Sequence, residues 1–141
     1  MTHQLTAVPI GADMQDDGKV AILLGTFNGA AYLAEQLASI AAQEHASWAV
    51  WASDDGSHDG TQAILDAFGR QWGGARLSVV AGPRKGFAAN FLSLACRPEI
   101  DAEYFAFSDQ DDIWAPGKLR RALVWLKSIP RDTPALYCTR T

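Results

Sequence analysis

Cysteine, histidine and long apolar stretches are scarce in this chain of 141 residues. Cys96 and Cys138 match no metal motif and leave no further cysteine for a disulfide framework, so we expect buried free thiols. His3, His45 and His58 show no ligand spacing and are expected at the surface. No stretch approaches the ~20 apolar residues that a membrane-spanning helix requires. These absences disfavour disulfide-rich, zinc-binding and membrane-spanning classes of protein.

An excess of positive charge is also missing, since the formal net charge is −4. This balance gives no electrostatic support for a nucleic-acid partner. Basic residues gather at 84–85 and 118–121, and we interpret the second group as a solvated helix face, with phosphate or an anionic membrane surface as the alternative. Residues 1–18 lack the apolar core of a secretory signal and are expected to form a flexible leader before one domain over 19–141.

Apolar runs alternate with helical patterns along that domain. Strands are predicted over 20–24, 48–53, 77–81 and 104–108, with a fifth beginning at 135–138. Helices are predicted over 30–42, from Asp59 to a stop at Gly69, over 87–96, and from Pro116 onward. In the first helix Leu33, Leu37, Ile40 and Ala41 would form one apolar stripe. The alternation predicts an α/β fold with a mainly parallel sheet and helices on both faces.

Polar loops follow each of the predicted strands. They begin at Gly25-Thr26-Phe27-Asn28, at Asp54-Asp55, at Gly82-Pro83-Arg84-Lys85 and at Asp109-Gln110-Asp111-Asp112. In open parallel sheets, ligands bind outside the carboxyl ends of the strands. We therefore expect these four loops, of which two are acidic, to converge on one crevice.

Asp109 and Asp111 are the candidate metal ligands of this crevice. In an extended segment their side chains point the same way, because side chains alternate with a period of two. Carboxylates crowded at one sheet edge repel each other, and a divalent cation with a bound phosphate ligand would resolve the repulsion. A solvated turn, with Asp109 or Asp112 capping a helix, is the alternative interpretation of this motif.

The remaining candidates would surround a nucleotide. Asp54 or Asp55 could accept a hydrogen bond from the imide N–H of uracil or thymine, although a turn capped by aspartate and serine is an alternative. Phe27 could stack on a base or join the core. Arg84 and Lys85 could hold a phosphate or lie in water. Trp114 is expected to form a wall on the sugar side, and Asn90 is either a pocket residue or an exposed polar residue.

Three motifs together resemble family 2 glycosyltransferases, which have the GT-A fold. They are Thr26-Phe27-Asn28-Gly29, Asp54-Asp55-Gly56-Ser57-x-Asp59-Gly60-Thr61, and Ser108-Asp109-Gln110-Asp111-Asp112-Ile113-Trp114-x-Pro116-x-Lys118-Leu119. The resemblance runs from about residue 19 to the end of the chain. The Asp-Gln-Asp-Asp-Ile-Trp variant resembles the rhamnosyltransferase-like branch, which builds bacterial surface polysaccharides.

This resemblance implies a UDP- or dTDP-linked sugar donor, Mg²⁺ or Mn²⁺ as cofactor, and a saccharide or lipid-linked acceptor. It further implies an inverting reaction and a cytoplasmic location, with peripheral association at the inner face of the membrane as an alternative. Asp55 would contact the base, Asp109 the ribose region, and Asp111 the metal. The nucleotide-binding set implied by the resemblance also includes Thr26, Phe27, Asn28, Asp54, Lys85, Gly86 and Asn90.

One departure from the family concerns the general base that deprotonates the acceptor. It lies in a later segment of family members, and no acidic residue follows Asp132 in this chain, so we expect it beyond Thr141. The chain is then the donor-binding half of an enzyme, with poor sugar transfer on its own; a non-catalytic nucleotide-sugar-binding module is the alternative. Receiver domains and Asp-nucleophile phosphohydrolases place acidic residues after the first strand, which this chain does not. No Gly-x-Gly-x-x-Gly supports a dehydrogenase.

Overall fold

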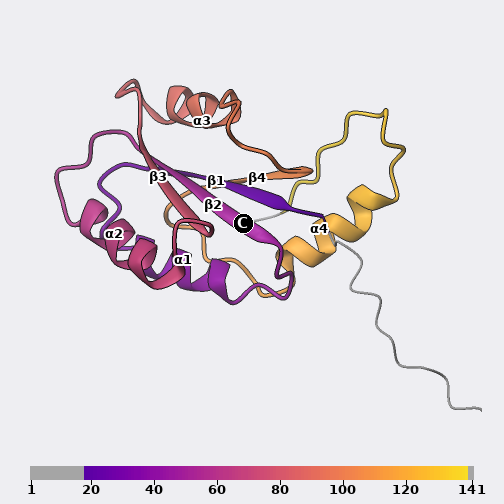
Figure 1. The fold of residues 1–141 in the computed structure, drawn as a ribbon, viewed down its shortest axis with the longest axis horizontal. Coiled ribbons are helices and arrows are strands. Elements are labelled where there is room, and N and C mark those ends of the chain that lie inside the picture. Colours follow the sequence, from indigo (N-terminus) through magenta and orange to yellow (C-terminus); the bar gives the residue numbers. More distant parts are fainter. Residues whose placement is uncertain (1–17, 140–141) are drawn as a thin grey trace, which may run out of the picture.

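A computed structural model describes residues 18–139 and shows a four-stranded, entirely parallel sheet (Figure 1). The strands are β1 (Val20–Thr26), β2 (Trp48–Asp54), β3 (Leu77–Ala81) and β4 (Tyr104–Ser108). The helices are α1 (Leu33–Ala41), α2 (Thr61–Trp72), α3 (Phe87–Ala95) and α4 (Lys118–Lys127). This arrangement confirms the predicted α/β class.

Two sequence-based expectations concern the ends of the chain. The leader predicted over 1–18 falls, except for Gly18, outside the described residues. Thr141, beyond which the general base is expected, also lies outside them. The structure therefore tests neither expectation, and both stay predictions.

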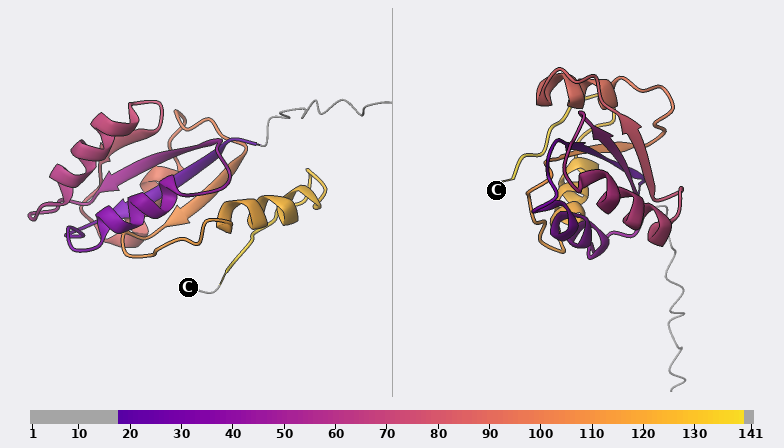
Figure 2. Two further views of the ribbon diagram at one scale, coloured as in Figure 1. Left: turned by 90° about the horizontal axis from the view of Figure 1, so that it is seen from below. Right: turned by 90° about the vertical axis from the view of Figure 1, so that its left-hand side faces the viewer.

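Both faces of β1, at the centre of the sheet, are covered, as its continuous apolar sequence requires. Figure 2 shows α3 on one side of the sheet and α1, α2 and α4 on the other. The larger apolar core joins Ile22 and Leu24 of β1 to Leu37 of α1 and Leu65 of α2. The smaller one joins the intervening β1 residue Leu23 to α3. Successive β1 side chains thus enter opposite cores, which explains why no polar residue interrupts the strand.

The strand order β3-β2-β1-β4 places a topological switch point between β1 and β4. The chain moves outward from β1 through β2 to β3, and then returns to the other side of β1 as β4. Pairing of β1 with β4 ends at Leu24 opposite Ser108, whereas pairing of β1 with β2 continues to Thr26 opposite Asp54. The loops after β1 and β4 therefore separate at the carboxyl edge, where open α/β sheets bind ligands.

Polar residues on the inner face of α1 fix the segment that follows β4. Gln36 is fully buried and donates from Nε2 to Ser108 Oγ at 2.6 Å. The Ser39 hydroxyl accepts a hydrogen bond from the Trp114 backbone N–H at 3.0 Å. These two contacts fix the residues on either side of the acidic loop 109–112. The apolar stripe predicted for this helix gave no indication of them.

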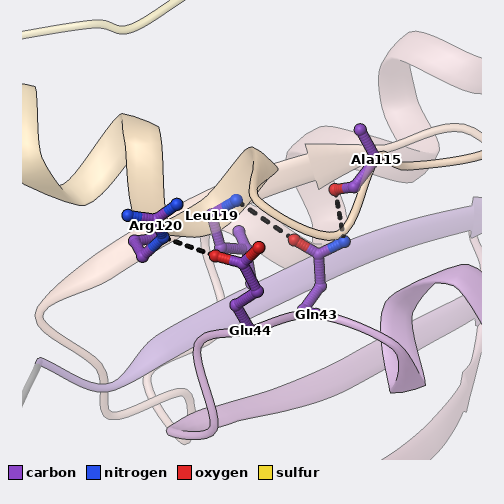
Figure 3. A network of polar contacts seen from close by, with 5 residues as sticks. All are labelled: Gln43, Glu44, Ala115, Leu119 and Arg120. Atoms are coloured by element: carbon purple, nitrogen blue, oxygen red, sulfur yellow. Dashed lines mark hydrogen bonds and ion pairs between the residues drawn. The ribbon is translucent and has the colours of Figure 1, made fainter.

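A second group of contacts anchors the start of α4 (Figure 3). Gln43 donates from Nε2 to the Ala115 carbonyl at 2.9 Å and accepts from the Leu119 N–H at 3.1 Å through Oε1. Glu44 forms an ion pair with Arg120 beside them. Gln43 thereby satisfies one of the N–H groups that the beginning of a helix leaves without an intrahelical partner. The start of loop 109–117 is consequently tied to α1 through Gln36, and its end is tied to Gln43, just after α1.

Several sequence-based expectations about burial are wrong. Cys96 and Cys138 are free thiols but exposed, and His45 is buried, with Nε2 lying 3.0 Å from the Gly18 carbonyl oxygen. Ala41 is exposed at the last position of α1. Trp114, expected to form a wall on the sugar side, belongs to the larger core at 3% exposure and does not line the pocket at the carboxyl edge that is described below.

Two predicted element boundaries also differ. α2 continues past Gly69 and ends at Trp72, where Gly73 has a positive φ of 82°. No strand forms over 135–138, which lies within the described residues. In that segment the Tyr137 ring packs against Trp125 of α4 at 5.7 Å between ring centroids. This aromatic contact places Tyr137 beside α4.

Candidate functional site

A pocket of about 600 Å³ lies at the carboxyl edge of the sheet, where β1 and β4 separate. Most of the residues that the sequence singled out line it. They are Thr26, Phe27, Asp55, Gly86, Asn90, Asp109 and Asp111. Asp55 and Asp111 come from loops after β2 and β4, and they share this one pocket. The expected convergence of strand-end loops is therefore found in the structure.

Three predicted residues do not line the pocket. Asn28 has a left-handed φ of 47°, and its Oδ1 accepts the His58 N–H at 2.9 Å, so it joins the loops after β1 and β2. Asp54 accepts hydrogen bonds from the Thr26 hydroxyl at 2.9 Å and the Ser57 N–H at 3.0 Å. Lys85 is exposed and is not among the lining residues. Asn28 and Asp54 shape the loops from behind the pocket.

Asp55 is the most enclosed carboxylate of the pocket, at 9% exposure. Its Oδ1 accepts the Arg84 N–H at 2.6 Å, and its Oδ2 accepts the Gly86 N–H at 2.9 Å. Arg84 and Gly86 have positive φ values of 57° and 89°, which curl the loop after β3 around the carboxylate. Each carboxylate oxygen can accept a second hydrogen bond, so Asp55 both organises the loop and keeps acceptor capacity.

Asn90 is buried rather than exposed, at 2%. Its Nδ2 donates to the Ser53 carbonyl at 2.8 Å, and its Oδ1 accepts from the Ser53 hydroxyl. These two contacts fix α3 to the end of β2. Asn90 therefore holds the floor of the pocket in place and uses most of its hydrogen-bonding capacity within the protein itself.

Aromatic rings stand on two sides of the pocket. Phe27 is 53% exposed after β1, and Phe87 is 79% exposed at the start of α3. Apolar rings left in water beside a cavity are suited to stacking against a flat ligand. Phe91 lies deeper and contacts the Phe107 ring edge-to-face at 5.6 Å between centroids. Phe87 and Phe91 were not identified as site residues from the sequence, because their apolar spacing indicated only a helix. Arg84, for which the sequence left open a contact with phosphate or a position in water, is exposed and lines the pocket.

The acidic end of the pocket is formed by Asp109 and Asp111. Partial loss of hydration raises the pKa of Asp109 above its usual value, and the charges of Asp112 and then Asp111 raise it further. Asp59, in contrast, lies outside the pocket and has a lowered pKa, chiefly because the Thr61 hydroxyl and N–H donate to it. Burial and the neighbouring charges thus disfavour the charged form of Asp109.

The lining charges leave the pocket as a whole negative. Asp55, Asp109 and Asp111 are opposed by Arg84 alone among the lysine and arginine residues that line it. Within residues 18–139, no group of three or more histidine, cysteine, aspartate or glutamate side chains is placed to hold a metal ion. Asp109 and Asp111 nevertheless supply the oxygen ligands that Mg²⁺ and Mn²⁺ take when phosphate oxygens complete their coordination. These residues fit a cation that is shared with a bound phosphate group.

Comparison with known proteins agrees with this geometry. The family model "Glycosyl transferase family 2" matches residues 21–136. A dTDP-rhamnosyl transferase of Shigella flexneri is 33% identical over 105 residues, which cover 71% of this chain and 35% of that protein. A UDP-Glc:alpha-D-GlcNAc-diphosphoundecaprenol beta-1,3-glucosyltransferase of Escherichia coli is 27% identical over 104 residues, which cover 74% of this chain and 39% of that protein.

A solved structure shows the same fold around a donor and a metal. It is a mannosyltransferase of Pyrobaculum calidifontis in complex with GDP-Man and Mn²⁺, with a TM-score of 0.70 and 27% identity. The alignment covers 77% of this chain and 32% of that structure. The chain thus spans about a third of the length of the relatives it matches. It belongs to glycosyl transferase family 2.

Proposed function

We propose that this chain is the donor-binding part of a metal-dependent glycosyltransferase that uses a UDP- or dTDP-linked sugar. The observation that carries the proposal is the single pocket in which Asp55, Asp109, Asp111 and Phe27 meet at the switch point. The names of the two curated relatives, one a dTDP-rhamnosyl transferase and one a UDP-Glc-dependent transferase, support this class of donor.

The base would occupy the end of the pocket lined by Phe27, Phe87 and Asp55. The exposed Phe27 ring offers a stacking surface, and Asp55 retains acceptor capacity for the imide N–H of uracil or thymine. An ionised carboxylate cannot donate a hydrogen bond, so it disfavours bases that present only acceptors at that position. This end of the pocket would therefore select the base.

The diphosphate would lie toward Asp109 and Asp111, which would hold Mg²⁺ or Mn²⁺. When bound, the cation supplies Lewis-acid stabilisation of the leaving diphosphate. Asp111 would be a direct ligand, and Asp109 would contact the ribose region or the same metal. The Mn²⁺ complex of the mannosyltransferase neighbour supports a divalent cofactor. Asp55, farther along the pocket, orients the base and thereby the sugar at the other end of the donor.

Transfer would occur with inversion, to a saccharide or lipid-linked acceptor in the synthesis of a surface polysaccharide. The name of the glucosyltransferase relative, with its diphosphoundecaprenol-linked acceptor, supports a lipid-linked class. The general base for this acceptor would lie beyond Thr141, in keeping with relatives about three times as long as the matched segment. A non-catalytic nucleotide-sugar-binding module has no specific observation in its favour, and the acidic pair Asp109 and Asp111 favours the enzyme.

A thermal-shift panel of UDP, dTDP, GDP and CMP, each with and without Mn²⁺, tests the donor class. We expect UDP or dTDP to raise the unfolding temperature only when Mn²⁺ is present, and CMP to raise it less, because cytosine presents an acceptor where uracil and thymine present the imide N–H. Ligand at 100 times its dissociation constant stabilises a protein by about 2.7 kcal/mol, which is a readily measured shift. Failure of all four nucleotides to protect the chain with Mn²⁺ would contradict the proposal.

Peripheral contact with the inner face of a cytoplasmic membrane belongs to the same proposal. No helix within residues 18–139 is long and apolar enough to cross a bilayer. Residues 113–131, however, contain five basic residues and no acidic one, in a chain whose net charge is −4. Val124 and Trp125 are 66% and 42% exposed on α4 among those charges. Such a mixture of basic and apolar side chains suits an anionic lipid surface.

Co-sedimentation with phosphatidylglycerol-containing vesicles tests this contact. Each basic residue near an anionic surface contributes about 1 kcal/mol, so the Arg121→Glu/Arg131→Glu variant is expected to bind at least about tenfold more weakly. Arg70→Glu, an exposed change on α2, is the matched control and should bind like the unaltered chain. Equal sedimentation with neutral phosphatidylcholine vesicles would contradict an electrostatic contact.

A further inference from the structure

The side chain of Gln110 bridges the loops after β1 and β4 at the mouth of the pocket. Its Nε2 donates to the Phe27 carbonyl at 3.0 Å, and its Oε1 accepts the Phe27 N–H at 2.9 Å. Backbone pairing between β1 and β4 ends before this point, at Leu24 opposite Ser108. The Gln110 amide therefore continues the connection between the two chain segments after the strands have separated.

This double contact requires an amide. Asparagine and glutamine alone carry a neutral donor and an acceptor side by side at the end of a side chain, and an ionised glutamate can only accept. Gly29 leaves room for the Gln110 side chain, because a Cβ added at Gly29 would overlap Gln110 Oε1. Gly29 does not have a positive φ, so its lack of a side chain serves the close approach rather than an unusual backbone conformation.

Gln110 lies between the two candidate metal ligands. In the part of the chain that the structure describes, the carboxylates of Asp109 and Asp111 accept no hydrogen bond from the protein. Their direction is set by the backbone of the loop, and Gln110 is the residue within that loop that fixes it to Phe27, directly after β1. Phe27, at the other end of the contact, is the exposed ring proposed to stack on the base.

We propose that Gln110 is a positioning residue that couples the base-stacking ring of Phe27 to the Asp109 and Asp111 carboxylates. This inference rests on the proposed function for the identity of the two ligands. Ordering of Phe27 by a base then orders the acidic loop, and a cation in that loop orders Phe27. By thermodynamic linkage, Mn²⁺ and the nucleotide increase each other's affinity by the same factor, and that factor depends on Gln110.

Titration calorimetry of UDP, with and without Mn²⁺, tests the coupling. For Gln110→Ala we expect UDP affinity in Mn²⁺ to fall about tenfold, the effect of losing two hydrogen bonds of ordinary strength. The factor by which Mn²⁺ enhances UDP affinity should fall too. Gln110→Met keeps the length of the side chain without its hydrogen bonds and should behave like Gln110→Ala. Gln62→Ala, whose amide contacts Asp66 on the exposed side of α2, should behave like the unaltered chain.

A double-mutant cycle checks the contact itself by unfolding temperature. Gly29→Ala should lower that temperature in the unaltered chain, and should lower it much less in the Gln110→Ala background, where the overlapping group is gone. An unchanged Mn²⁺ enhancement in Gln110→Ala, or full recovery by Gln110→Met, would overturn the coupling. If the unaltered chain binds no UDP in Mn²⁺, the proposed function itself is overturned, and this inference with it.

Discussion

Replacing Asp111 with asparagine should abolish the Mn²⁺-dependent part of nucleotide binding. Asp111 lines the acidic end of the pocket, and no hydrogen bond from within residues 18–139 occupies its carboxylate. Loss of a residue that merely supports a metal ligand costs about 10- to 100-fold in affinity, so loss of a direct ligand should cost at least about 100-fold. Asparagine keeps the shape and one oxygen, and it also removes a charge that raises the pKa of Asp109. Without metal, the Asp111→Asn variant should therefore be at least as stable to unfolding as the unaltered chain.

Calorimetric titration of Mn²⁺ in the presence of saturating UDP measures this effect. Asp112→Asn is the matched control, because Asp112 stands next to Asp111 and also raises the pKa of Asp109, yet it does not line the pocket. The control should retain Mn²⁺ affinity within a few fold. Equal losses in the two variants would show that the net charge of the loop, rather than a ligand at position 111, attracts the cation.

The strands could be predicted from the sequence because burial on both faces of a parallel sheet requires nearly unbroken apolar runs. The run at 104–108 coincides with β4, and that at 77–81 coincides with β3. The strand expected at 135–138 shows the limit of this reasoning. A short apolar run satisfies equally well a contact with a neighbouring aromatic ring, as Tyr137 does on Trp125. Periodicity does not distinguish the two.

The site could be located from the sequence, but not its internal order. Acidic loops after parallel strands must meet at one edge, which is why Asp55 and Asp111 share a pocket. Whether a carboxylate faces the ligand or its own loop depends on which backbone N–H groups lie near it. Asp54 and Asp55 are adjacent in sequence, yet the first is turned to Thr26 and Ser57 while the second lines the pocket.

The polar contacts beneath the site left no recognisable pattern in the sequence. Gln36 lies on the inner face of α1, whose apolar spacing already accounted for its amphipathic character, and Gln43 follows just after the end of that helix. Their partners are backbone groups and a hydroxyl more than 70 residues away, which no local pattern encodes. The contact of Gln110 with Phe27 is equally long-range, and the acidic motif around Gln110 does not indicate it. Side-chain hydrogen bonds between residues far apart in the sequence thus become visible only in the structure.

Asp55→Ala should weaken UDP binding about 100-fold. Hydrogen bonds to a charged group contribute about 1.5–3 kcal/mol each, and this carboxylate accepts two from the loop after β3. Loss of both would release Arg84 and Gly86 from the left-handed conformations that curl the loop, and the acceptor offered to the base would disappear as well. A loss of about 3 kcal/mol in binding corresponds to roughly 100-fold in the dissociation constant.

Asp55→Asn separates the two contributions. The amide keeps one acceptor for the loop but replaces the other with a donor that opposes either the Arg84 or the Gly86 N–H. We expect it to fall between Asp55→Ala and the unaltered chain in unfolding temperature, and to discriminate less between UDP and CMP. Asp66→Ala, an exposed carboxylate on α2 that accepts from Gln62, should alter neither measurement. If Asp55→Ala binds UDP within about threefold of the unaltered chain, the base does not depend on this carboxylate, and the orientation proposed for the donor in the pocket is wrong.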